Sequence, residues 1–190
     1  MGAPSDRGTA RKGDRAGSRG SVGGTAQAER SHVRHLHDDW RDRGRPLVRV
    51  FVDSNIPMYV AGADHPNRGP ATHFLETAGD AGYELSTSAE VLQEILYRYT
   101  ALGRADLADR VYDLFVGLVP TVFSVTLADT DLAKRILLST PGLSARDAVH
   151  AAVMLNRDVS WLATFDQGFD RVEGVNRVEL VSGAQSASRG

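Results

Sequence analysis

Short apolar runs rich in β-branched residues alternate with longer amphipathic segments from Leu47 to Val181. The short runs have the length and composition of buried strands, and the longer segments have the period of helices. Strands that alternate with helices form βαβ units, so we predict an α/β fold with a mostly parallel sheet and helices on both faces. The predicted strands are Leu47–Val52, Tyr83–Ser86, Thr121–Val125, Trp161–Thr164 and Arg177–Val181, and the predicted helices are Arg68–Gly79, Ser88–Leu102, Ala105–Leu118, Leu127–Leu138 and Ala145–Asn156.

Hydroxyl residues that stand three positions before a carboxylate support several of the predicted helix starts. Such pairs occur at Thr87–Glu90, Thr126–Asp129 and Ser144–Asp147. In this arrangement the hydroxyl and the carboxylate satisfy backbone N–H groups that the first turn of a helix leaves unpaired. We therefore expect each of these pairs to cap a helix.

Charge divides the 190-residue chain into two parts. Residues 1–47 carry a net charge of +4, and residues 48–190 carry a net charge of −6. Because residues 1–46 are also rich in Gly, Ser and Arg and lack apolar periodicity, we predict a disordered basic extension there, one domain at 47–182 and a flexible tail at 183–190. An acidic domain does not attract nucleic acid through its overall field, so nucleic-acid binding would depend on local basic groups and metal ions.

The composition excludes several kinds of site. The chain has no cysteine, which rules out disulfides, thiolate zinc sites, iron–sulfur clusters and cysteine nucleophiles. Any metal must therefore bind oxygen or imidazole. No apolar run approaches the roughly 20 residues of a membrane span, and the N-terminus lacks the apolar segment of a secretory signal, so we expect a cytoplasmic protein without membrane contact.

Four acidic residues stand where a parallel sheet and its helices would bring them together. Asp53 and Asp166 each follow an apolar strand, so both should emerge at the carboxyl edge of the sheet, where ligands bind. Glu94 lies past the first turn of its helix and has no capping role there, while Asp147 begins a helix rich in small residues that allow close packing. Taken singly, these acids also have structural explanations: helix capping accounts equally well for Asp53, the helix dipole accounts for Asp147, and an exposed helix position is the usual explanation of a residue such as Glu94. Thr164 should point to the same side as Asp166 and could orient a carboxylate or a metal-bound water.

His150 follows Asp147 by one turn of the same predicted helix. A histidine among Ala148, Ala151 and Ala152 is more typical of a packed residue, or of one that supports a ligand, than of a metal ligand. We therefore leave it out of the predicted metal site.

The order of these residues resembles the PIN-domain family, and in particular the VapC-type toxins of bacterial type II toxin–antitoxin pairs. The resemblance implies a three-layer α/β/α sandwich, an acidic pocket that binds Mg²⁺ or Mn²⁺, and hydrolysis of single-stranded or looped RNA. It also implies a cognate antitoxin that blocks the pocket, and a homodimer. The extension at 1–46 departs from the family, whose members usually begin near the first strand. The motifs span Val48 to about Val181 and read Val52-Asp53-Ser54-Asn55, Ser88-x-x-Val91-x-x-Glu94, Asp147-Ala148-x-x-Ala151-Ala152 and Thr164-x-Asp166-x-x-Phe169.

The resemblance and the chemistry of phosphodiester cleavage together give a hypothesis for each acid. A divalent metal neutralises charge on the phosphoryl oxygens and generates a nucleophile from water, and Mg²⁺ prefers hard oxygen ligands. Asp53 and Asp147 would hold the principal metal. Glu94 and Asp166 would bind a second metal or orient the attacking water. The side chains that would support these four ligands are Thr164, Ser54 and Asn55.

Two other functions fit parts of the sequence. A haloacid-dehalogenase-like phosphatase also places an Asp after its first strand and uses Mg²⁺, but it would need a second Asp where Asn55 stands. A PIN-fold adaptor would bind RNA or protein without catalysis, although all four acids are present here. The sequence does not determine the substrate contacts, for which Arg68, Arg98 and Arg146 are candidates. Core packing and partner binding explain equally well the apolar residues Tyr97, Tyr99, Phe115 and Leu118.

Overall fold

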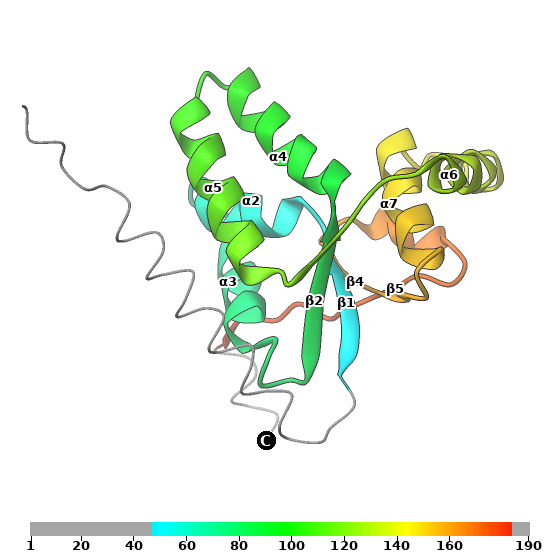
Figure 1. The fold of residues 1–190 in the computed structure, drawn as a ribbon. Helices are drawn as coiled ribbons and strands as arrows, with labels where there is room; N and C mark the ends of the chain where they lie inside the picture. The colour runs from blue at the N-terminus through cyan, green and yellow to red at the C-terminus, as the bar shows by residue number, and fades with distance from the viewer. Residues whose placement is uncertain (1–46, 184–190) are drawn as a thin grey trace, which may run out of the picture.

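A five-stranded parallel sheet lies at the centre of the domain (Figure 1). The computed structural model describes residues 47–183, so the predicted extension 1–46 and residues 184–190 of the predicted tail lie outside the described residues. The strand order is β3-β2-β1-β4-β5, and every neighbouring pair is parallel. The strands are β1 (Val48–Val52), β2 (Tyr83–Ser88), β3 (Thr121–Phe123), β4 (Trp161–Ala163) and β5 (Asn176–Arg177).

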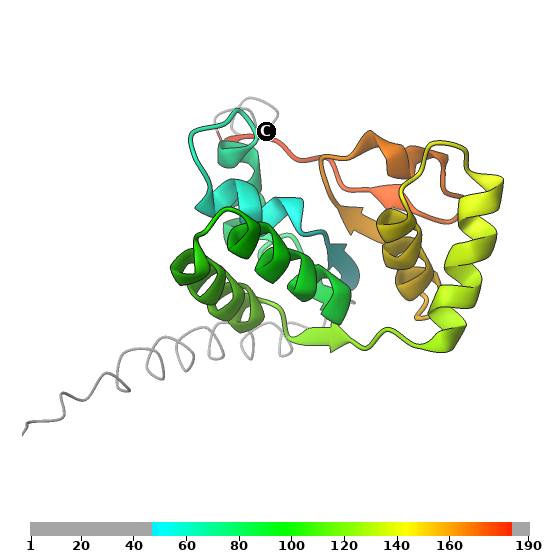
Figure 2. The same cartoon turned by 90° about the horizontal axis from the view of Figure 1, so that it is seen from above.

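Helices cover both faces of this sheet, which confirms the predicted three-layer α/β/α arrangement. Figure 2 shows the first four helices together on one side of the strands, and α6 and α7 on the other side. The helices are α2 (Asn55–Ala61), α3 (Arg68–Thr77), α4 (Ala89–Ala101), α5 (Ala105–Leu118), α6 (Leu127–Ser139) and α7 (Ala145–Leu155), with a short 3₁₀ helix, η1 (Gln167–Arg171), after β4. In the described part of the chain, no helix is long and apolar enough to cross a membrane.

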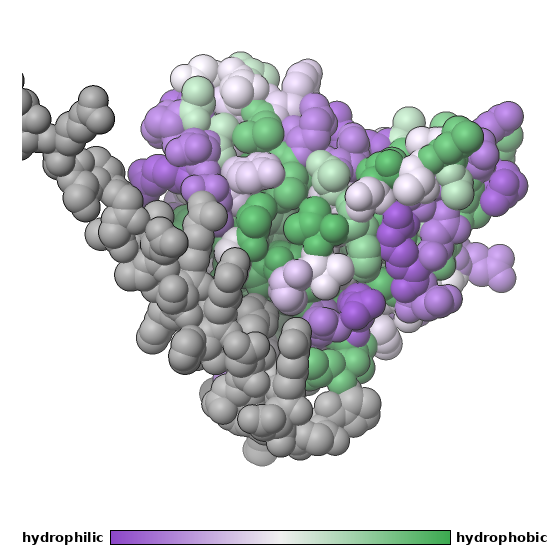
Figure 3. Space-filling model, viewed as in Figure 1, coloured by the Kyte–Doolittle hydropathy of each residue, from purple (hydrophilic) through white to green (hydrophobic). Residues whose placement is uncertain are grey.

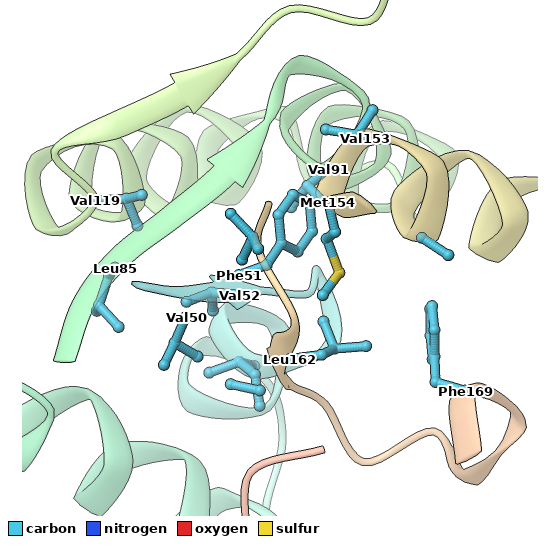
Figure 4. Packing of buried hydrophobic residues seen from close by; sticks show 14 of the residues in the cluster. Val50, Phe51, Val52, Leu85, Val91, Val119, Val153, Met154, Leu162 and Phe169 are labelled. Atoms are coloured by element: carbon cyan, nitrogen blue, oxygen red, sulfur yellow. The ribbon is translucent and has the colours of Figure 1, made fainter. Parts of the chain in front are cut away.

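The core is centred on β1, the middle strand of the sheet. Val50, Phe51 and Val52 are each fully buried, because helices cover both sides of a central parallel strand. Figure 4 shows these residues among apolar side chains from α4, α7 and β4, and Phe169 of η1 joins the same cluster. The core therefore fixes the carboxyl end of β1, where the chain turns from apolar to acidic.

The helix caps differ from the prediction at one of three positions. The cap at Thr87 is wrong, because β2 continues to Ser88 and the buried Thr87 hydroxyl donates to the Val52 carbonyl oxygen at 2.9 Å. Ser88 instead caps α4 by accepting a hydrogen bond from a backbone N–H. The other two caps are confirmed: Thr126 begins α6 with a full capping box, and Ser144 begins α7.

Two short elements and two further strands also differ from the prediction by more than one residue. No range was predicted for α2 and η1, which have only 7 and 5 residues. β3 ends at Phe123 rather than at Val125, and the last strand is Asn176–Arg177 rather than Arg177–Val181. Just after β5, the Val178 N–H donates to the Leu162 carbonyl oxygen at 2.8 Å.

Candidate active site

Asp53 stands immediately after β1 and is almost completely buried, with 5% of its surface exposed. Its Oδ1 accepts hydrogen bonds from the backbone N–H of Ser54 at 2.6 Å and from the Ser54 hydroxyl at 3.3 Å. Its Oδ2 accepts from Asn55 Nδ2 at 2.6 Å and from the Thr164 hydroxyl at 2.7 Å. All of these donors are neutral, so they fix the carboxylate in place without balancing a negative charge.

Glu94 reaches the same place from α4. Its Oε1 accepts a hydrogen bond from Arg146 Nη1 at 2.6 Å, and its side chain is 18% exposed. Its Oε2 lies 3.5 Å from Nε2 of His150. Glu94 therefore has one oxygen on a cation and the other directed at an imidazole.

His150 completes the compact group, which the sequence analysis did not predict. The ring is 1% exposed and packs against Phe51, with ring centroids 6.0 Å apart. Within residues 47–183, neither ring nitrogen has a hydrogen-bond partner. Asp53, Glu94 and His150 each offer one ligand atom, and these atoms lie within 4.8 Å of one another. The sequence signal for His150 was its place one turn after Asp147, on the inward face of α7.

Asp147 and Asp166 lie on the wall of the same cavity but outside this compact group. The cavity has a volume of about 640 Å³, and all four predicted acids line it. Asp147 is half-buried, and its Oδ2 accepts from the Ser144 hydroxyl at 2.6 Å. Asp166 is exposed, and its Oδ1 accepts from the Gly168 N–H at 2.6 Å at the start of η1. The fold thus gathers the four acids in one cavity, two at its centre and two with local hydrogen bonds on its wall.

The family of the chain follows from a comparison of its sequence with known protein families. Residues 50–175 match the family described as the PIN domain, and this range holds β1, the site and η1. The chain belongs to the PIN-domain family. The match includes all four acids and His150, so the cavity lies wholly within the PIN domain.

Relatives of this PIN domain are similar over most of its length. Ribonuclease VapC13 of Mycobacterium tuberculosis is 44% identical over 129 residues, which are 68% of this chain and 98% of the relative. Ribonuclease VapC23 of the same species is 40% identical over 117 residues, 62% of this chain and 92% of the relative. Both proteins are named as ribonucleases of the VapC type.

Solved structures share the fold of the PIN domain at lower sequence identity. VapBC2 from Rickettsia felis, bound to a DNA fragment from its promoter, has a TM-score of 0.57 at 16% identity and covers 69% of this chain and 98% of its own. VapC20 of Mycobacterium tuberculosis, described as a Sarcin-Ricin loop cleaving toxin, has a TM-score of 0.55 at 21% identity and covers 64% and 92%. At these identities the likeness establishes the fold.

The two central carboxylates of the PIN domain have pKa values shifted in opposite directions. Burial raises the pKa of Asp53, and the nearby His150 and the Thr164 hydroxyl only partly oppose this effect. Burial also acts to raise the pKa of Glu94, but the His150 and Arg146 side chains outweigh it and hold that pKa at about 2. Glu94 is therefore charged at neutral pH, whereas the neighbours of Asp53 offset only part of the desolvation cost of its carboxylate.

A divalent cation fits this donor set. In the described range 47–183, no Lys or Arg lies within ion-pair distance of Asp53, and its negative charge has only neutral hydrogen-bond donors. Buried charges normally have an opposite charge or a metal beside them. Two carboxylates supply the hard oxygen ligands that Mg²⁺ and Mn²⁺ prefer, and His150 adds a nitrogen without a hydrogen-bond partner.

Proposed function

We propose that this chain is a ribonuclease that uses a divalent metal, Mg²⁺ or Mn²⁺, to hydrolyse RNA phosphodiester bonds. The observation that carries the proposal is the buried Asp53 carboxylate, which faces Glu94 and His150 without a neutralising cation. VapC-type relatives that match nearly their full length with this chain are named as ribonucleases, which supports the same activity here.

Asp53 and Glu94 would hold the ion at the centre of the cavity, and Asp147 and Asp166 would contribute from its wall. When bound, the ion supplies charge stabilisation at the phosphoryl group and a water of lowered pKa. Mg²⁺ keeps several of its waters, so acids on the wall can act through water molecules. Their local hydrogen bonds to Ser144 and Gly168 orient them for this role.

The neighbouring residues would hold these carboxylates in position. Thr164 donates to Asp53 and accepts a hydrogen bond from Asn55 Nδ2 at 2.7 Å, so the three side chains form one closed network. Thr164 Oγ1 also accepts from the Asp166 N–H at 3.1 Å, which couples the end of β4 to the end of β1. His150 and Arg146 together hold the pKa of Glu94 at about 2, so this carboxylate stays charged.

We also propose that the protein acts in the cytoplasm as the toxin of a toxin–antitoxin pair and forms a homodimer. VapBC complexes are among the solved structures with this fold, which supports an antitoxin partner. Exposed apolar side chains offer contact surface: Leu114 of α5 is 59% exposed and Val122 of β3 is 40% exposed. Figure 3 shows apolar surface gathered in the middle of the face that carries these elements.

The decisive experiment is an RNA cleavage assay with purified protein. We expect total RNA to be cut in Mg²⁺ or Mn²⁺ and to remain intact in excess EDTA. Asp53→Asn should lower the cleavage rate at least about 100-fold, because metal stabilisation of the transition state is worth several kcal/mol. The matched control is Asp131→Asn, which changes an exposed acid of α6 outside the cavity and should cut at the wild-type rate.

Each alternative function has its own outcome in this assay. RNA binding without cleavage under any metal would identify a PIN-fold adaptor. Metal-dependent hydrolysis of p-nitrophenyl phosphate without RNA cleavage would identify a phosphatase. Equal cleavage by wild type and Asp53→Asn would remove Asp53 from the site.

A further inference from the structure

The cavity at the carboxyl edge of the sheet is larger than a metal site requires. Its volume is about 640 Å³, whereas one ion with six waters occupies roughly 200 Å³ at about 30 Å³ per water. Besides the acids, its lining includes Tyr59 and His65 from the chain that follows β1, and Tyr97 and Arg98 from α4. The cavity therefore has room, and non-acidic side chains, for a part of the substrate beyond the reacting phosphate.

Two of these side chains form a stacked pair. The ring centroids of Tyr59 and His65 lie 4.5 Å apart, and their planes are inclined by 24°. Phe165 meets the Tyr59 ring edge-on, with centroids 5.2 Å apart and planes at 87°. His65 Nδ1 accepts a hydrogen bond from the backbone N–H of Asn67 at 3.1 Å. Contacts from two sides thus hold the pair in one orientation.

The stacked pair is tied to the acidic centre by the segments that carry both. Tyr59 lies on α2, whose first residue, Asn55, donates to Asp53. Phe165 directly precedes Asp166, and its N–H donates to Asn55 Oδ1 at 3.4 Å. The distance from the rings to the reacting centre is therefore fixed by the same hydrogen bonds that position the Asp53 carboxylate.

We propose that the Tyr59–His65 pair is the subsite for one unpaired nucleobase next to the scissile phosphate, an inference that rests on the proposed ribonuclease function. His65 is exposed while Tyr59 is half-buried, so the outer face of His65 can accept a further ring. Unpaired RNA bases stack on tyrosine and histidine rings in this way. The exposed Arg98 lines the same cavity and supplies a positive charge for a neighbouring phosphate.

The proposal is tested by a double-mutant cycle between one base of the RNA and the His65 ring. Binding of fluorescein-labelled octa-adenylate RNA is measured by anisotropy in Ca²⁺, together with eight versions that each carry one abasic nucleotide. Stacking on one aromatic ring is worth about tenfold in affinity. In wild type, an abasic nucleotide at one position should weaken RNA binding about tenfold. In His65→Ala, an abasic nucleotide at the same position should weaken RNA binding less than about twofold. Two control variants should show the same tenfold weakening by the abasic nucleotide as wild type. They are His65→Phe, which keeps a stacking ring, and His73→Ala, which changes a residue outside the cavity.

Each other outcome overturns the proposal in a recognisable way. An equal abasic penalty in wild type and His65→Ala, or no penalty at any position, shows that no base stacks on this ring. Unchanged RNA binding by His65→Ala together with weakened binding of a protein partner assigns the pair to that partner. If wild type cleaves RNA and the cycle fails, only the subsite is lost. If wild type cleaves no RNA, the proposed function and the subsite fail together.

Discussion

Two carboxylates lie almost wholly inside the domain, and their surroundings differ in one respect. Asp53 is 5% exposed and Asp129 is 1% exposed. Asp129 Oδ1 accepts from Arg157 Nη1 at 2.8 Å and from Asn156 Nδ2 at 2.8 Å, while its Oδ2 accepts from Arg157 Nη2 at 3.0 Å. Asp53 accepts four hydrogen bonds, and every donor is neutral. The difference between the two sites is the presence of a resident cation.

The resident cation gives the two carboxylates opposite pKa shifts. The Arg157 guanidinium holds the pKa of Asp129 well below its ordinary range and also donates to the Ser124 carbonyl oxygen at 2.6 Å, so this pair joins the start of α6 to the end of α7. Burial raises the pKa of Asp53, which no guanidinium opposes. A buried carboxylate that keeps its charge unbalanced is poised to bind a cation from solution.

The largest expected effect on folding comes from removing the charge of Asp129. Asp129→Asn leaves the mostly buried Arg157 without its counter-ion and should lower the free energy of unfolding by about 3 kcal/mol. Asp53→Asn removes an unbalanced charge and should leave the metal-free protein at least as stable as wild type. Urea unfolding in EDTA measures both variants. Equal destabilisation by the two substitutions would show that the two carboxylates do not differ as described.

Metal binding should distinguish the two sites in the opposite direction. Mn²⁺ at 100 times its dissociation constant should stabilise wild type by about 2.7 kcal/mol, because only the folded chain assembles the site. Asp129→Asn should show the same increase in the free energy of unfolding with Mn²⁺, although the variant is less stable without metal. Asp53→Asn should lose most of this increase. Thermal unfolding across a Mn²⁺ titration measures the gain. A full gain in Asp53→Asn would place the ion elsewhere.

The two carboxylates should also give stability opposite dependences on pH in the metal-free protein. Asp129 has a lowered pKa when folded, so its stabilisation is present above its ordinary pKa of 3.8 and is lost as the pH falls below that value. Asp53 has a raised pKa when folded, so its destabilising effect is complete above that raised pKa and disappears as the pH falls from there toward 3.8. Unfolding free energies of both Asn variants between pH 3 and 7 test this. A variant slope identical to wild type in either case would contradict the assigned shift.

The smallest expected effect comes from removing the Arg146 cation that pairs with Glu94, so that Glu94 has no guanidinium beside it, as Asp53 has none. Arg146→Gln removes the cation from Glu94 and should raise its pKa from about 2 toward the ordinary 4.5. Stability should change by less than about 1 kcal/mol, because the Arg146 side chain is 41% exposed and its ion pair is screened by water. A ¹³C NMR titration of the Glu94 carboxyl measures the pKa. An unmoved value would mean that Arg146 does not contribute to the lowered pKa of Glu94.

Local sequence patterns predicted the elements that depend on local interactions. The α5 range Ala105–Leu118 matches the prediction, and the Thr126 capping box forms as its spacing indicated. The position of Asp53 after an apolar strand also predicted its place at the sheet edge. The cap at Thr87 failed because pairing with the neighbouring strand carries β2 two residues further, and this depends on a strand distant in sequence.

Contacts between distant segments could not be predicted in the same way. Asp129 was predicted as a capping residue, but its pairing with Arg157 spans 28 residues and depends on how α6 packs against α7. His150 joins the acidic group because α7 turns it toward Glu94, which lies 56 residues earlier in the chain. Spacing placed the acids on the right elements, while packing determined which side chains face one another.

The hydrogen bond between Thr164 and Asp53 joins residues 111 positions apart. Because β1 pairs with β4 only after nearly all of the domain has been synthesised, a growing chain on the ribosome cannot close this edge of the sheet early. The acidic cavity is consequently among the last parts of the domain to assemble. A chain that ends before β4 lacks both the Thr164 hydroxyl and the Asp166 carboxylate, so it contains only part of the acidic cavity.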